Sequence, residues 1–489
     1  MEVFRNFRVA DIGPEAVPPL FWLLALLSLL PLCVVLPMAS PRAGIAIILG
    51  WTALLWIAIS FARGQFHYFV LAWVAVYPYC YYFLSYPTER SIFTLDRAFI
   101  VMLAIQMFVV SRHAAVVPLM REVWISGYLW GLYLLICLLS LAGHPPSEVL
   151  PSYRLLVDGM VMPAMFGLYA MRYFPLLRNF QKLHICVCIL GIGLCISGLV
   201  ELTTGVDLFP WNGADPEFTD THVRRADGPF ELPAVLSIVA ILAFFLIVYL
   251  RQLMPRRISG WRTLLHRTGA VASFAAALIP LNRGLVFALA PVAIIDSCSK
   301  NRLLPRRFWA ALFGLILLGA MGARLLYPRL YDDRVARPDN VYQRLAQDRE
   351  TLRVVREYPL FGVGFNLYHE FTSRDPRYLA RWKGIESMNF PHNALMTVLS
   401  EEGIVGLLFY VSAQAFLMVA MWRMRKVYPR GWLVFLYCVL IYVLIGIDYA
   451  TVYYSDINLF YIFTLGLLFQ MQTRMLQETK PAASTQDLS

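Results

Sequence analysis

Long apolar runs recur along almost the whole chain, and they constrain its fold more than any other feature. A membrane-spanning helix needs about 20 mostly apolar residues. The sequence contains fourteen windows of this kind, at about 18–39, 43–61, 67–87, 94–111, 123–142, 154–173, 183–203, 230–250, 265–281, 284–299, 307–326, 403–422, 432–450 and 456–473. The ninth and tenth abut, so they could also form one long buried stretch with a break. The sequence predicts an all-α polytopic membrane protein with about 14 (12–14) transmembrane helices.

The composition supports this prediction and excludes other classes of protein. Hydrophobic residues make up 59% of the chain and charged residues 15%, whereas an average soluble domain has about 25% charged residues. A soluble globular enzyme, a disordered chain and a fibrous repeat are therefore excluded. The first window is longer than the apolar core of a secretory signal, so we expect it to be retained as a helix.

Basic residues are distributed unevenly between alternate loops. If both termini are cytoplasmic, the inner loops hold 23 of the 42 Lys and Arg residues and the short outer loops hold 7. The other 12 lie in one long loop, and long loops escape the positive-inside rule. We therefore expect both termini in the cytoplasm. The net charge of +11 then records orientation in the lipid bilayer, and no nucleic-acid partner is expected.

The spacing of the windows divides the chain into four parts. Residues 1–326 hold the first eleven helices and a short outer loop at 204–229, and residues 327–391 form one large outer loop. Residues 392–476 hold the re-entry and the last three helices, and 477–489 form a polar tail that we expect to be disordered.

The large loop contains two recognisable local patterns. Residues 340–357 predict an amphipathic helix, whose apolar stripe would comprise Leu345, Leu352, Val355 and Val341. The paired glycines of 359–365 predict a turn directly after it. The loop is therefore expected to contain short helices.

Arginines gather at the predicted outer membrane surface. Arg283 stands between two apolar runs, and an arginine near the bilayer centre costs roughly 2.5–3.5 kcal/mol on insertion scales. A guanidinium matches phosphate oxygens in a bidentate manner, so a lipid diphosphate would suit this environment. Arg283 could instead snorkel or pair with a carboxylate. Arg224 and Arg225, which precede the eighth window, could contact the same anion or be solvated loop charges.

His392 begins the re-entry after a proline. Its imidazole could act as a neutral base, and neighbouring arginines would lower its pKa. A structural role in capping the next helix is an equal alternative. Glu401, Glu402, Asp158 and Asp448 lie in or beside windows, where each could pair with an outer arginine or line a cavity. Acidic ligand spacing for a divalent metal is absent from the outer loops, so neither a metal nor another cofactor is expected.

Several short motifs occur in a characteristic order over 225–410. They are Arg225 before Gly228-Pro229-Phe230, Asn282-Arg283-Gly284, Arg344, Pro359-Leu360-Phe361-Gly362-Val363-Gly364, His392-Asn393-Ala394-Leu395 and Glu402-Gly403-Ile404-Val405-Gly406. Their order, together with many helices and one large outer loop near the end, resembles the O-antigen ligase and polymerase superfamily of bacterial inner-membrane proteins.

The resemblance implies a C-type membrane glycosyltransferase fold in the bacterial inner membrane, with its active site facing the periplasm. Such enzymes move a glycan from undecaprenyl diphosphate to an acceptor hydroxyl, without a metal and with inversion at the anomeric carbon. The implied catalytic residues are His392, Arg283 and Arg225. The expected substrate-binding residues are Arg224, Arg344, Asn393 and Glu402.

The sequence leaves the acceptor open. Lipid A-core would make the protein a ligase, a growing lipid-linked glycan would make it a polymerase, and a protein hydroxyl would make it a protein O-glycosylation enzyme. A transporter or flippase of lipid-linked glycan is the competing class. Such a protein would favour paired broken helices and short loops, which the large outer loop does not match.

Overall fold

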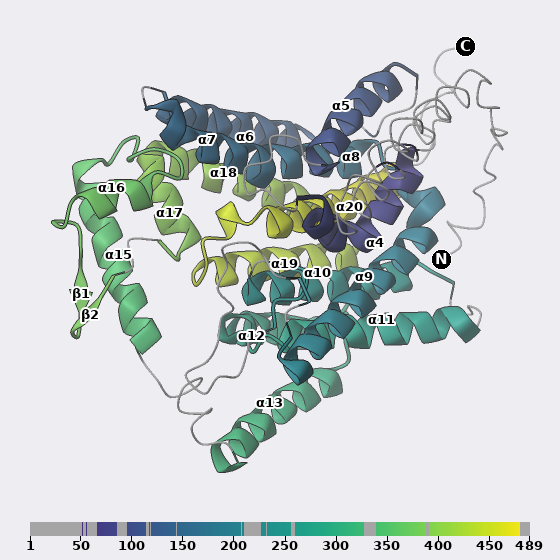
Figure 1. Ribbon diagram of the computed structural model, residues 1–489. Helices are drawn as coiled ribbons and strands as arrows, with labels where there is room; N and C mark the ends of the chain where they lie inside the picture. The colour runs from purple at the N-terminus through teal and green to yellow at the C-terminus, as the bar shows by residue number, and fades with distance from the viewer. Residues whose placement is uncertain are drawn as a thin grey trace, which may run out of the picture. The chain divides into compact units, whose positions relative to one another are not determined.

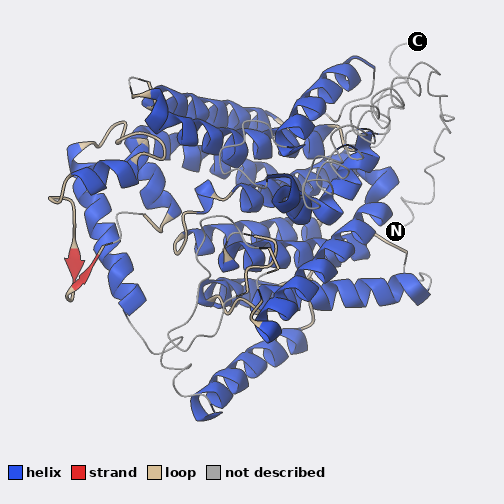
Figure 2. Ribbon diagram, viewed as in Figure 1, coloured by secondary structure: helices blue, strands red, loops and turns tan. Residues whose placement is uncertain are grey.

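A computed structural model of the chain describes residues 51, 55, 66–85, 95–113, 117, 119–142, 144–206, 208–209, 226–230, 232–255, 260–326, 339–387 and 391–479. Almost all regular structure in these ranges is helical, and the strands that they contain form one small hairpin (Figure 2). The chain divides into two compact units, residues 1–99 and 100–489.

The first unit contains helix α4, Phe66–Ser85, and the beginning of α5, Leu95–His113. Their ends are joined by aromatic packing, because the ring of Phe99 stacks on Phe66 at 5.6 Å and on Trp73 at 5.5 Å between centroids. Offset aromatic pairs add to the free energy gained from burial alone. These two helices coincide with the third and fourth apolar windows.

The second unit contains the remaining helices and the hairpin (Figure 1). The elements are α6 Arg121–Ser140, α7 Pro146–Leu156, η3 Val157–Val161, α8 Met162–Arg172, α9 Leu176–Thr204, α10 Pro233–Gln252, α11 Gly260–Leu278, α12 Arg283–Cys298, α13 Arg306–Leu326, α15 Asp339–Glu357, α16 Tyr368–Arg374, β1 Arg381–Trp382, β2 Ile385–Glu386, α17 Ala394–Glu401, α18 Gly403–Arg423, α19 Pro429–Gly446, η5 Thr451–Tyr453 and α20 Ser455–Thr479.

The apolar windows and the helices agree closely. Every window from the third onward coincides with a helix, α7, η3 and α8 together filling the sixth, and the ninth and tenth are separate helices. Within the described residues, six helical stretches are long and apolar enough to cross a bilayer: Arg121–Ser140, Val149–Arg172, Leu176–Thr204, Pro233–Gln252, Gly403–Arg423 and Pro429–Gly446. An all-α membrane protein is confirmed. The count of fourteen stays a prediction, and the first two windows lie outside the described residues apart from 51 and 55.

Helix α10 lies at the centre of the second unit. It is apolar on all sides, and 94% of its most apolar window is buried against other helices, as expected for a core helix. Its neighbours are α9, α11, α19 and α20. Small residues allow α20 and α8 to pack closely. A Cβ on Gly466 of α20 would lie only 2.7 Å from the carbonyl oxygen of Gly167 in α8.

Polar contacts join helix ends that the window count places on one side of the membrane. Ends expected to be cytoplasmic are joined by Arg423–Glu122, Gln470–Phe174, Gln472–Tyr428 and Tyr437–Asp296. Ends expected to be outer are joined by Asp227–Glu201, Phe365–Ser140, Tyr453–Glu401 and Arg344–Asp448. These contacts agree with the predicted alternation of helix direction from α6 onward.

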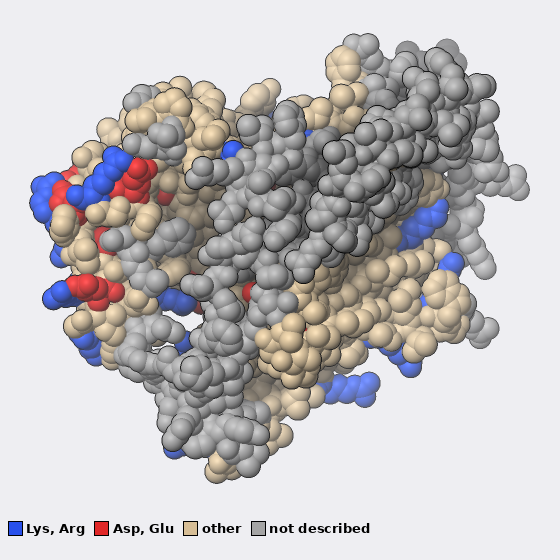
Figure 3. All heavy atoms as spheres, in the orientation of Figure 1, with Lys and Arg blue, Asp and Glu red and all other residues tan. Residues whose placement is uncertain are grey.

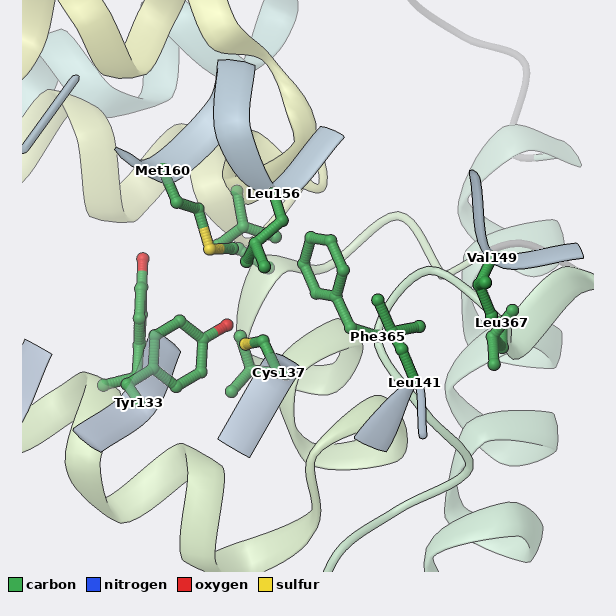
Figure 4. Packing of buried hydrophobic residues seen from close by; sticks show 12 residues of the cluster. Tyr133, Cys137, Leu141, Val149, Leu156, Met160, Phe365 and Leu367 are labelled. Carbon is green, nitrogen blue, oxygen red and sulfur yellow. The ribbon is translucent and has the colours of Figure 1, made fainter. Parts of the chain in front are cut away.

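The large loop packs onto the helices through buried apolar residues. Phe365 and Leu367 of the loop join one cluster with Leu141 at the end of α6 and with Val149 and Leu156 of α7. Figure 4 shows the ring of Phe365 directed toward Leu156. Insertion of loop side chains into this core holds the loop against the helical part of the second unit.

Helix α15 confirms the predicted helix in the loop, but the predicted apolar stripe is wrong. Val341, Leu345 and Leu352 are 52%, 36% and 41% exposed. The buried face instead carries polar side chains, and Glu350 accepts hydrogen bonds from the hydroxyls of Tyr368, at 3.0 Å, and Ser387. Satisfied hydrogen bonds compensate for burial of these groups, so polar residues share the buried face with the apolar Ala346 and Val354.

The C-terminal end of α12 is fixed by one carboxylate. Asp296 is fully buried and accepts hydrogen bonds from the backbone amides of Leu303 and Leu304, at 2.6 and 3.0 Å. The indole of Trp309 and the hydroxyl of Tyr437 each donate to it at 2.8 Å. One side chain therefore ties α12 to the start of α13 and to α19.

Replacement Asp296→Asn should destabilise the protein, because the amide nitrogen of asparagine would face donors and leave them unpaired. We expect a loss of about 2–4 kcal/mol of unfolding free energy, measured by unfolding in mixed micelles. Glu386→Gln is the matched control, because Glu386 pairs with Arg381 on the exposed hairpin and such pairs contribute little. Equal stability of the two variants would contradict this role of Asp296.

Candidate functional site

Local backbone geometry places Arg283 at the first position of α12. Leu281 has a φ of +53°, a left-handed conformation that is rare outside glycine. The side chain of the next residue, Asn282, accepts a hydrogen bond from the amide of Gly284 at 2.9 Å and so caps the helix. The turn and the cap together set the point where α12 begins. The Arg283 side chain is therefore held at a helix N-terminus, which carries partial positive charge.

The loop between α19 and η5 brings a carboxylate to the same helix end. A Cβ on Gly284 would lie 3.0 Å from Oδ2 of Asp448. Asp448 also forms an ion pair with Arg344 of α15, and the Arg344 guanidinium lies 5.8 Å from the ring centroid of Tyr449. The expectation that Asp448 could pair with an outer arginine is confirmed. Arg344 and the start of α12 therefore meet at one carboxylate.

His392 lies within electrostatic reach of this pair. Burial, and then the positive charge of Arg344, lower the pKa of His392 to about 4. The imidazole is therefore uncharged at neutral pH, as predicted from the nearby arginines. The next residue, Asn393, accepts hydrogen bonds from the amides of Leu395 and Met396, at 3.0 and 3.3 Å. Asn393 thus caps α17 and sets the position of His392.

Arg283 differs from Arg344 in having no anionic partner among the described residues. The described residues contain no ion pair or hydrogen-bond partner of its guanidinium, although the side chain is half-buried. The alternative that Arg283 pairs with a carboxylate is therefore not seen among these residues. A half-buried guanidinium at a helix N-terminus is suited to an anion from outside the protein.

Two of the sequence motifs bind one another through their backbones. The amides of Val363 and Gly364 donate to the carbonyls of Ser400 and Glu401, at 3.0 and 2.8 Å, and the amide of Ile404 donates to the carbonyl of Pro359 at 2.9 Å. We call this set of bonds between 359–364 and 400–405 the clasp. It joins the large loop to the junction of α17 and α18, where the chain re-enters the helical part.

Glycine is required where the two segments of the clasp approach each other. Gly362 and Gly403 have φ values of +64° and +69°, and a Cβ on Gly403 would lie 2.2 Å from the carbonyl oxygen of Leu360. The Glu401 carboxylate adds a bond from the amide of Asn366 at 2.7 Å. The glycines of the two motifs are therefore explained by the structure, because a side chain at either position would clash with the facing backbone.

Glu402 occupies an apolar environment. It is 1% exposed, and burial raises its pKa well above the usual range, an effect strengthened by the charge of Glu401. The Cys137 thiol and the Tyr133 hydroxyl offset part of this rise in the pKa of Glu402. Its contact with substrate stays a prediction, and its burial favours a structural role.

Arg224 and Arg225 lie outside the described residues, but the segment that follows them is held firmly. Glu201 of α9 is fully buried and accepts hydrogen bonds from the amides of Asp227 and Gly228, at 3.1 and 2.8 Å. The base of the loop is thereby attached to α9. The roles of Arg224 and Arg225 stay predictions.

Gln347 lies one turn beyond Arg344 on α15 and was not among the residues predicted from the sequence. It is 2% exposed, and neither its amide nitrogen nor its oxygen has a hydrogen-bond partner among the described residues. Buried polar groups without partners are rare in proteins. An apolar-stripe pattern gives no signal for such a residue, because it assumes that the buried face is hydrophobic. Among the described residues, no cluster of three or more His, Cys, Asp or Glu could hold a metal.

The fold and this site define an all-α membrane protein with an arginine–histidine cluster where several helices end. Residues 268–411 match the family model described as O-antigen ligase, which confirms the resemblance to the O-antigen ligase and polymerase superfamily. The matched segment contains Arg283, Arg344, His392, Asn393 and Glu402, as well as both sides of the clasp. A search of curated proteins finds no match.

The clasp predicts a strong effect of Gly403→Ala. The added methyl would clash with the Leu360 carbonyl, and the fold would force alanine to adopt a positive φ. We therefore expect a loss of about 3 kcal/mol or more of unfolding free energy. Gly384→Ala is the matched control, because Gly384 has a φ of +86° with no heavy atom within 4 Å of its Cβ position. It should lose only about 1–2 kcal/mol. Similar unfolding midpoints for both variants would show that the clasp is not tightly packed.

Proposed function

We propose that the protein is a glycosyltransferase of the inner membrane that moves a glycan from undecaprenyl diphosphate to an acceptor hydroxyl on the periplasmic side. The observation that carries the proposal is the position of Asp448, which pairs with Arg344 and lies beside the start of α12, the helix that Arg283 begins. Arg344 also acts on His392, and these residues lie within or beside the segment that matches the O-antigen ligase family. The acceptor is lipid A-core or a growing lipid-linked glycan, and the reaction inverts the anomeric centre without a metal.

The arginines would stabilise the leaving group. When the bond between the anomeric carbon and the diphosphate oxygen breaks, negative charge develops on that oxygen. Arg283 and the N-terminus of α12 would bind this charge directly, and Arg344 would add positive charge beside it. Preorganised donors of this kind are worth several kcal/mol each in a site with little water. Arg225, with Arg224, would approach the same diphosphate from the loop before α10.

His392 would receive the proton of the acceptor. The acceptor oxygen bonds to the anomeric carbon on the face opposite the diphosphate, and its proton passes to the neutral imidazole. The low pKa of His392 in the free protein makes it a weak base. The negative charge of a bound diphosphate would raise this pKa again. The substrate would therefore activate its own base.

Offering acceptors separately to the purified protein, with a lipid-linked oligosaccharide as donor, distinguishes the alternatives. Product on lipid A-core indicates a ligase, a longer lipid-linked chain a polymerase, and a modified hydroxyl on a protein a protein glycosyltransferase. Movement of the lipid-linked glycan across a vesicle membrane without consumption of an acceptor would instead favour the flippase alternative.

The assigned roles predict that Arg283→Ala and His392→Ala each lower the rate of glycan transfer by at least about 100-fold. Transfer is measured as radiolabelled glycan moved to the productive acceptor. Both variants should remain inserted and show the unfolding midpoint of the wild type. Wild-type turnover by either variant would remove that residue from the site.

A metal-independent mechanism predicts that transfer continues in excess EDTA. The charge of the diphosphate would be met by guanidinium groups instead of a divalent cation, so the rate should change by less than about twofold. The comparison is made with protein washed in EDTA and then supplied with Mg²⁺ or Mn²⁺. Strict dependence on added metal would overturn this part of the proposal.

The influence of Arg344 on His392 predicts a change in pH dependence. In Arg344→Gln the cation that lowers the pKa of His392 is removed, and Asp448 is left as a nearby anion. The pKa should rise, so the acid limb of kcat/KM, which reports the free enzyme, should move to higher pH. Arg356→Gln, an exposed arginine on the same helix, should leave the limb in place. If the acid limb of kcat/KM stays in place in Arg344→Gln, His392 is not the group whose titration produces that limb.

A further inference from the structure

A pocket lies between the large loop and His144, apart from Arg283, Arg344 and His392. Its volume is about 310 Å³, at the lower end of the usual range for small-molecule sites. It is lined by His144, Tyr358, Val363, Leu367, Glu370, Phe371, Arg374, Asp375, Arg377 and Tyr378. The lining does not include Arg283, Arg344 or His392, so the pocket is not part of the proposed reaction centre.

Three aromatic rings give the pocket a firm wall. Phe371 of α16 packs between Tyr358, 5.3 Å away at 85°, and Tyr378, 5.1 Å away at 42°. The hydroxyl of Tyr378 donates to Glu357 at 2.6 Å, which fixes the third ring. Tyr358 remains 42% exposed. An aromatic surface of this kind can cover the apolar C–H face of a sugar ring.

The charged residues of the pocket neutralise one another. Arg374 is paired with Glu370, and Arg377 is paired with Asp375, whose carboxylate also accepts from the Arg377 amide at 3.0 Å. Basic and acidic side chains lie together over this part of the loop in Figure 3, at the left of the view. Two cations and two anions leave no net charge to attract a phosphate. They do present donors and acceptors to uncharged hydroxyl groups.

We propose that this pocket binds a short, uncharged stretch of saccharide in a glycan chain whose linkage reacts at the Arg283–His392 site. Aromatic faces combined with paired, charge-neutral donors and acceptors suit a polyhydroxylated ring better than an anion or a lipid tail. The clasp connects the two places, because Val363 lines the pocket and bonds to Ser400 at the end of α17. The inference rests on the proposed function only for the identity of the glycan as a substrate.

Binding of free oligosaccharide tests the pocket without the reaction. The probe is the set of oligosaccharides released by mild acid from the cell's own surface polysaccharide, which carry no lipid and no diphosphate. Binding to the full-length protein in micelles is followed by saturation-transfer NMR and titration calorimetry. We expect wild type to bind, and Tyr358→Ala and Arg374→Ala each to bind about tenfold more weakly, equivalent to about 1.4 kcal/mol. Inorganic diphosphate should not compete.

Phe361→Ala is the matched control, because Phe361 is a 60% exposed aromatic residue in the same turn and does not line the pocket. It should bind the probe as wild type does. Absence of wild-type binding, equal weakening by Phe361→Ala and Tyr358→Ala, unchanged binding in both pocket variants, or displacement by diphosphate would each overturn the inference.

Transfer assays separate this inference from the proposed function. Tyr358→Ala should raise the KM for the glycan substrate that occupies the pocket about tenfold and leave kcat near its wild-type value. Selective loss of oligosaccharide binding in Tyr358→Ala, in a protein that transfers no glycan, would overturn the proposed function and keep the pocket. Normal transfer with unchanged binding in Tyr358→Ala would overturn the pocket and keep the proposed function.

Discussion

The clasp between 359–364 and 400–405 is the contact on which the placement of the large loop depends. Its hydrogen bonds join backbone to backbone. They therefore fix both the distance between the two segments and their alignment along the chain. Helix α15 precedes the clasp and the last residues of α17 belong to its second segment, which means that Arg344 and His392 are placed from the two sides of one junction. A shift of one residue here would move both relative to the start of α12.

Much of the fold follows from the sequence because the bilayer permits few backbone conformations. Apolar windows of about 20 residues have to form helices when no water can satisfy the peptide groups, and those within the described residues coincide with helices. The prediction was weaker in the large loop, where water and hydrogen bonds offer alternatives. The face of α15 around Glu350 is buried by polar contacts to Tyr368 and Ser387, and no hydrophobic periodicity reports such contacts.

The candidate site residues stand out in the sequence more clearly than the contacts between them. Arg283 and His392 stand out in sequence because charge beside apolar runs is costly. Asp448 was one of several acidic residues that could pair with an arginine, and only the contact of α15 with the loop after α19 selects it. The clasp could be seen as paired glycines, but the close approach of Gly362 to Glu401 and of Gly403 to Leu360 depends on contacts between separate parts of the chain. Gln347 gave no signal.

The two asparagine caps have a consequence for how such proteins can vary. Asn282 fixes the start of α12 one residue before Arg283, and Asn393 fixes the start of α17 one residue after His392. The positions of Arg283 and His392 are therefore set by the helices beside them and not by the connections that precede those helices. The connections before these two helices can therefore lengthen or shorten while Arg283 and His392 keep their places.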